Sequence, residues 1–128
     1  GGTGLSTSVQ IPVVAGQSIN AIWVDSSGEG FAAGGSGGIW RRPTRSGAWS
    51  LIAPSGPTMG YSTLAGRSLT DVWVTDVSGN VLQWNGSGFA KRAVLGTWNG
   101  RAATVTGPGD VWVAGVSAAG GTIFRYMP

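Results

Sequence analysis

The chain contains neither cysteine nor histidine, and only 10% of its 128 residues are charged. Without cysteine there is no disulfide or thiolate chemistry. Without histidine, the commonest general base and the commonest metal ligand are both missing. No stretch approaches the roughly 18 consecutive apolar residues that a membrane-spanning helix needs. We therefore expect no metal, no cofactor and no membrane span.

What the chain does contain is glycine and tryptophan. It has 24 glycines, seven tryptophans and 41% hydrophobic residues, a composition that favours a packed core over disorder. Its net charge is +3, and its densest basic cluster is Arg41, Arg42 and Arg45. That cluster is too short for a nucleic-acid tract, so we interpret it as a solvated turn and expect no nucleic-acid partner. The low charge and abundant Gly, Ser and Thr are typical of a secreted or cell-surface protein.

A tryptophan-centred apolar run recurs three times, each time followed by a turn and a second run that ends in an aromatic. The first tryptophan recurs after 50 residues (73 − 23) and again after 39 (112 − 73). A blade of the WD type takes roughly 40–45 residues, so the repeat predicts an all-β propeller with three four-stranded blades. The copies are Ala21-Ile22-Trp23-Val24 to Gly38-Ile39-Trp40, Asp71-Val72-Trp73-Val74 to Val81-Leu82-Gln83-Trp84, and Asp110-Val111-Trp112-Val113 to Thr122-Ile123-Phe124.

The middle repeat predicts four strands, at residues 62–65, 71–75, 81–84 and 89–94. In the second of these, Val72, Trp73 and Val74 are apolar at consecutive positions. Successive side chains of a strand point to opposite faces, so this strand should be buried on both sides, as in a stack of sheets. Gly79 and Asn80 supply a turn that accepts positive φ.

The other repeats depart from this pattern, within a single domain that spans residues 1–128. The blades are predicted at roughly 10–52, 60–94 and 100–128, and the first blade is expected to carry a long second turn at residues 26–37. The third blade ends after its third strand, whereas residues 4–9 resemble a fourth strand without a third. Residues 4–9 are therefore expected to complete the last blade. A ring needs about 4–8 blades. Either two chains combine as a homodimer into a six-bladed ring, or the chain is part of a larger propeller.

The middle repeat resembles the tectonin-type and related bacterial propeller repeats, which have a "VW" strand, a "G-x-(I/V)" strand and a "(D/N)-G-x-x-W" turn. Many members of that group are lectins, so the resemblance implies carbohydrate binding. Only the middle repeat has the family's Asn85-Gly86 turn, where the first has Arg42-Pro43-Thr44. The matching residues are Asp71-Val72-Trp73-Val74 and Gly79-Asn80-Val81-Leu82-Gln83-Trp84-Asn85-Gly86-Ser87-Gly88-Phe89.

The carboxylates give little support for an enzyme. Asp71 and Asp110 occupy the same position of their repeats, before the tryptophan strand, where an aspartate bonds backbone N–H groups of a turn. Nothing in the spacing requires a catalytic carboxylate pair of the glycosidase type. We therefore expect a non-catalytic recognition module, which the resemblance implies binds surface glycans, or alternatively a structural and assembly subunit without sugar binding.

Trp98 stands outside the recurring tryptophan pattern, in a glycine-flanked loop beside Asn99 and Arg101. An indole with hydrogen-bonding neighbours suits stacking on a sugar ring. The alternative is a tryptophan folded over the neighbouring blade or at a subunit contact. Loops between fourth and first strands share a propeller face with those between second and third strands. The predicted binding residues are Trp98, Asn99, Tyr61, Arg101 and Glu29, with Met59 on the same face.

Overall fold

The computed structural model describes residues 18–35, 38–45, 47–52, 60–96 and 98–127. Within these ranges the regular elements are eleven β-strands, which confirms the all-β prediction. No helix among the described residues is long and apolar enough to cross a membrane.

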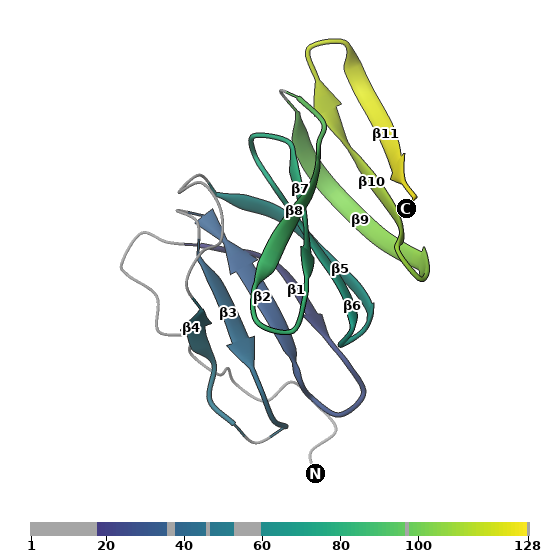
Figure 1. The fold of residues 1–128 in the computed structure, drawn as a ribbon. Coiled ribbons are helices and arrows are strands. Elements are labelled where there is room, and N and C mark those ends of the chain that lie inside the picture. The colour runs from purple at the N-terminus through teal and green to yellow at the C-terminus, as the bar shows by residue number, and fades with distance from the viewer. Residues whose placement is uncertain (1–17, 36–37, 46, 53–59, 97, 128) are drawn as a thin grey trace, which may run out of the picture.

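The strands form three antiparallel sheets in which each strand pairs with its neighbours in sequence (Figure 1). The first sheet holds β1 (Ile19–Val24), β2 (Gly30–Gly34), β3 (Ile39–Arg42) and β4 (Ser50–Ile52). The second sheet holds β5 (Tyr61–Ser68), β6 (Asp71–Asp76), β7 (Asn80–Trp84) and β8 (Phe89–Val94). The third sheet holds β9 (Asn99–Gly107), β10 (Asp110–Ser117) and β11 (Gly120–Tyr126).

The three sheets stack face to face, and their first strands lie next to one another: β1 beside β5, and β5 beside β9. One apolar cluster joins the first and second sheets, and a second joins the second and third. Strand β6 lies in the middle of this stack, and all six of its residues are buried. The consecutive apolar run at Val72, Trp73 and Val74 therefore has the cause that the sequence indicated, which is burial on both faces.

The second sheet matches the four predicted strands, although β5, β6 and β7 extend beyond the predicted bounds. The third sheet has three strands among the described residues, as predicted. Residues 4–9, the expected closing strand, lie outside the part of the chain that the structure describes.

The prediction for the first sheet assigns its strands wrongly, by one strand. Trp23 lies in the first strand, β1, whereas Trp73 and Trp112 lie in second strands, β6 and β10. The long turn predicted at residues 26–37 contains strand β2 instead. A short turn joins β1 to β2, with Gly28 at φ 92° and the Asp25 carboxylate accepting from the backbone N–H groups of Ser27 and Glu29. The predicted beginning of this blade, near residue 10, lies outside the described residues.

Strand β2 resembles a turn in sequence because it contains glycines. In the structure these glycines permit close packing. A β-carbon placed on Gly30 would lie 2.7 Å from the Cα of Val24, and one on Gly66 would lie 2.6 Å from the Trp23 ring. Real β-carbons do not approach other atoms this closely. Gly66 belongs to β5, so the absence of a side chain there is what lets Trp23 of the first sheet pack against the second.

In the first and second sheets, one aromatic on the second strand faces the sheet that follows. Phe31 of β2 contacts Trp84 of the second sheet, with ring centroids 4.8 Å apart. Trp73 of β6 contacts Tyr126 of the third sheet, with centroids 5.2 Å apart. The corresponding residue of β10 is Trp112, which is 36% exposed whereas Trp73 is 2% exposed. We call this recurring arrangement the aromatic step.

The aromatic step predicts that truncating a tryptophan to alanine lowers the free energy of unfolding by different amounts at Trp73 and Trp112. Trp73→Ala should lower the free energy of unfolding by about 3–5 kcal/mol, the range for large buried aromatics, because it empties the contact between two sheets. Trp112→Ala, the matched control, should cost about 1 kcal/mol or less, since surface changes have small effects. Urea titration followed by circular dichroism measures both. Equal losses would contradict the placement of Trp112 on an open face.

Candidate functional site

A groove of about 520 Å³ opens where the first strands of the three sheets begin. The three first strands converge here, and the residues at their starts line the groove. These residues are Ile19 and Asn20 from β1, Ser62 from β5, and Asn99, Gly100 and Arg101 from β9. Val77, in the turn between β6 and β7, completes the lining. We call this feature the groove. The loop entering a first strand and the turn between second and third strands thus meet at one end of the stack, as predicted.

Two of the predicted residues, Asn99 and Arg101, lie in the groove, and both are exposed. Among the described residues, neither side chain has a hydrogen-bond or ion-pair partner. Of the described residues that line the groove, Arg101 alone is charged. The groove therefore presents an uncompensated positive charge beside a free amide.

The rest of the polar lining is held in place by the sheets. The side-chain amide nitrogen of Asn20 donates to the backbone oxygen of Tyr61 at 2.8 Å, which ties β1 to β5. The Ser62 hydroxyl lies 3.4 Å from the backbone oxygen of Thr75, its acceptor in β6. Sequence reasoning missed Asn20 and Ser62. The signal that could have found them is their position at the start of first strands, once the first strand of the first sheet is correctly placed.

Trp98 is buried, and the expectation of an exposed stacking ring is wrong. Its side chain is 2% exposed and packs edge-to-face on Phe124, with ring centroids 5.7 Å apart. β-carbons on Gly100 and Gly115 would lie 2.8 Å and 2.6 Å from the indole. The glycines beside Trp98 thus accommodate its ring. This agrees with the first of the alternatives that the sequence leaves open, a tryptophan folded over the neighbouring blade.

Tyr61 is also buried, at 0% exposure, in the cluster between the first and second sheets. Burial raises the pKa of its phenol, and the nearby Asp76 carboxylate raises it further. Among the described residues its hydroxyl has no hydrogen-bond partner. Neither Tyr61 nor Trp98 therefore offers a ring to a ligand.

Glu29 lies away from the groove. It follows the turn after β1, whereas the groove lies at the beginning of that strand. The misplaced long turn caused this error. Met59 lies outside the described residues.

The five carboxylates of the chain are all described, and four of them hold turns or strands. Asp25 and Asp76 accept from backbone N–H groups of the turns that follow them, and the Ser27 hydroxyl lowers the pKa of Asp25. Asp71 accepts from the Trp73 indole at 2.7 Å. Asp110 pairs with Arg125, which holds the pKa of that carboxyl below its usual value.

The basic cluster of the first sheet is only partly a solvated turn. The Arg41 guanidinium lies over the rings of Phe31 and Trp84, 6.0 and 5.3 Å from their centroids. Arg42 donates to the backbone oxygens of Gly47 and Arg45. Both side chains are half-buried, and only Arg45 is exposed. Among the described residues, no group of three or more acidic side chains is placed to hold a metal ion.

No protein-family model matches the chain, and no curated protein matches it in sequence. Solved structures do match. The chain is similar to YCF48 from Cyanidioschyzon merolae, with a TM-score of 0.69 and 15% identity over 92% of this chain and 36% of that one. It is similar to YCF48 bound to D1 peptide, with a TM-score of 0.72 and 14% identity over 95% of this chain and 42% of that one.

A third similar structure is virginiamycin B lyase from Staphylococcus aureus, with a TM-score of 0.63 and 15% identity. That match covers 86% of this chain and 41% of the lyase. At such identities the similarity shows the fold alone, and the fold is that of a β-propeller, as predicted. The chain spans less than half the length of each of these propellers.

The buried phenol of Tyr61 predicts a loss of stability at alkaline pH. The pKa of Tyr61 is higher in the folded than in the unfolded state, where tyrosine titrates at about 10. The contribution of the neutral phenol to the free energy of unfolding is therefore complete below that pH. It is lost as the pH rises through the folded-state pKa. Tyr61→Phe should remove this loss. At neutral pH it should leave the free energy of unfolding unchanged or raise it by up to about 1 kcal/mol, since the hydroxyl lacks a partner among the described residues.

Urea titrations at neutral and alkaline pH test this, with Tyr126→Phe as the control because Tyr126 is half-buried. A loss above about 2 kcal/mol for Tyr61→Phe at neutral pH would mean that the hydroxyl is bonded, which would contradict the prediction.

Proposed function

We propose that this chain is a non-catalytic recognition module within a β-propeller, and that its groove binds a polypeptide segment bearing a carboxylate. One observation carries the proposal. Arg101 and Asn99, both exposed and unpartnered among the described residues, lie together in a groove of about 520 Å³. Ligand sites are concave and use a few well-placed polar groups, and this volume falls within their usual range.

The chemistry of the lining fits such a ligand. A guanidinium binds a carboxylate through two parallel hydrogen bonds, and this pairing is stronger than one between neutral groups. The Asn99 side chain can both donate to and accept from a peptide backbone. Ile19 and Val77 supply apolar contact beside these polar groups.

The state of the acidic residues supports a non-catalytic role. Asp25 and Asp76 hold turns, while Asp71 and Asp110 bond to side chains of their own sheets. A general acid or base has to be free to reach its substrate. None of these four aspartates lines the groove.

A polypeptide is favoured over a glycan, the ligand class that the resemblance to tectonin-type repeats implied. The sugar contact expected from the sequence is stacking on Trp98, with Tyr61 on the same face, and both rings are buried. One of the similar propellers was solved bound to a peptide. Since the chain spans less than half of these propellers, we further propose that it acts within a larger propeller and not as a six-bladed homodimer.

Removing the groove charge should weaken peptide binding selectively. Arg101→Gln should reduce binding to glutamate-containing peptides by about tenfold or more, because a hydrogen bond to a charged group contributes about 1.5–3 kcal/mol. Binding to the same peptides with glutamine should change little. Fluorescence anisotropy on a panel of matched Glu and Gln peptides measures the difference.

Lys91→Gln is the matched control, because it removes the same charge from an exposed position of β8 outside the groove. Equal losses for Arg101→Gln and Lys91→Gln would indicate attraction by net charge alone. Hits on a glycan array without any peptide binding would replace the proposed ligand with a sugar.

A further inference from the structure

A second hollow, of about 210 Å³, adjoins the groove. Val77 and Asn99 line both, so the two meet at the exposed amide of Asn99. Arg101 lines only the groove. We call the second hollow the side hollow. Its lining is completed by Trp98, Val116, Ser117 and Ala118.

The side hollow offers a ligand mainly apolar contact. None of the described residues that line it is charged. The Ser117 hydroxyl is used within its own hairpin, where it accepts from the backbone N–H of Ala119 at 3.2 Å and lies 3.3 Å from the Thr122 hydroxyl. Val116, by contrast, is 47% exposed. Apolar side chains in a concave site provide most of the contact with a ligand, and Val116 is placed to do so.

The place of Arg101 in the groove has a local cause, a β-bulge that recurs in all three sheets. In each first strand the pairing with the second strand skips one residue. A bulge leaves its extra residue unpaired in the ladder and re-aims the side chain. The skipped residues are Asn20, Ser62 and Arg101, and all three line the groove. Asn20 and Ser62 are bonded to the sheets, whereas Arg101 has no partner among the described residues.

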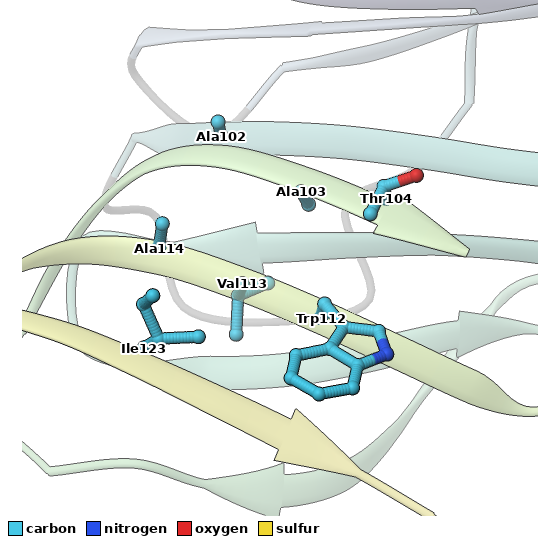
Figure 2. Close-up of a pocket in the computed structure, with 7 residues that line it drawn as sticks. All are labelled: Ala102, Ala103, Thr104, Trp112, Val113, Ala114 and Ile123. Carbon is cyan, nitrogen blue, oxygen red and sulfur yellow. The ribbon is translucent and has the colours of Figure 1, made fainter. Parts of the chain in front are cut away.

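The bulge at Arg101 also divides β9 between two surfaces. Ala102 and Thr104, which follow it, line a different hollow of about 170 Å³ together with Ile123 of β11 (Figure 2). That hollow shares no described lining residue with the groove or the side hollow. Asn99, which precedes the bulge, is the cross-strand partner of Val116. Opposite residues of antiparallel strands have Cα atoms about 4.5–5.5 Å apart, so the free amide and the exposed valine are immediate neighbours.

We infer that the groove and the side hollow bind two side chains of one extended polypeptide segment. A carboxylate pairs with Arg101, and an aliphatic side chain of valine or leucine size packs on Val116. The inference rests on the proposed peptide binding and adds a second recognised residue to it. At about 210 Å³ the side hollow is smaller than the roughly 300–1,000 Å³ of a whole ligand site, so it suits a single side chain. Asn99 bonds the backbone between the two residues.

The shared position of the two hollows determines the spacing of the recognised residues. Both lie where the starts of first strands meet the turns between second and third strands, here the turns that carry Val77 and Ser117. Successive side chains of an extended segment point to opposite faces. The acidic and the aliphatic residue therefore lie on one face of the segment, with one residue between them. Either chain direction satisfies this spacing.

Binding of labelled Gly/Ser peptides, measured by fluorescence anisotropy, tests the inference. One glutamate and one valine are placed with a single residue between them, in both orders, and compared with peptides in which serine replaces the valine. We expect the better order to bind about tenfold more tightly than its serine counterpart. Tenfold corresponds to about 1.4 kcal/mol, which the burial of one aliphatic side chain can supply. Peptides with adjacent glutamate and valine should lack this advantage.

Val116→Ser should abolish the valine advantage and keep the preference for glutamate over glutamine. Ile123→Ser is the matched control, because it removes an exposed aliphatic side chain from the hollow of Figure 2 and leaves the other two hollows unchanged. The control should retain both preferences. Val116 and Ile123 are 47% and 70% exposed, so neither change should unfold the chain.

The outcomes distinguish the inference from the proposed function. A glutamate preference without a valine advantage would overturn the inference and leave the proposed function intact. A valine advantage that survives Val116→Ser, or that the adjacent spacing shares, would overturn the inference in the same way. Absence of any preference for glutamate over glutamine would overturn the proposed function, and the inference with it.

Discussion

The structure depends on large aromatic rings that pack where the neighbouring backbone has no side chain. Trp23 lies against Gly66 of the next sheet, and Trp98 lies against Gly100 and Gly115. Stacked sheets ordinarily keep about 10 Å between them, so a ring of this size fits only where the opposite position is small. The contact between Trp23 and Gly66 joins two first strands, β1 and β5.

Few charges are present, and most of the acidic ones have structural roles. Asp76 fixes the turn that carries Val77 into the groove, while Asp71 joins two sheets through Gly109. None of the described carboxylates lines the groove, so Arg101 has no acidic partner there. The few acidic residues thus stabilise turns and leave Arg101 unpaired among the described residues.

The sequence predicted the second sheet nearly strand for strand, because the period-2 pattern and the consecutive run at Val72–Val74 report burial directly. It misled for β2 and Trp98, and for one physical reason. Glycine is compatible both with a turn and with close approach of a ring, and the local sequence does not distinguish them. From sequence, Gly30 and Gly34 fit a loop, and Gly100 fits the flank of an exposed loop. Of the five predicted site residues, Asn99 and Arg101 meet in the groove, because their place at the start of a first strand depends only on the repeat.

The pairing of rings with glycines also determines which residues can change independently. A methyl group added at Gly66 would occupy volume that the Trp23 indole already fills, so alanine there is compatible only with a smaller ring opposite. The combined volume of the ring and of the residue opposite it, on two different strands, is therefore fixed. Redesign of this protein, by selection or in the laboratory, would therefore have to exchange such partners together.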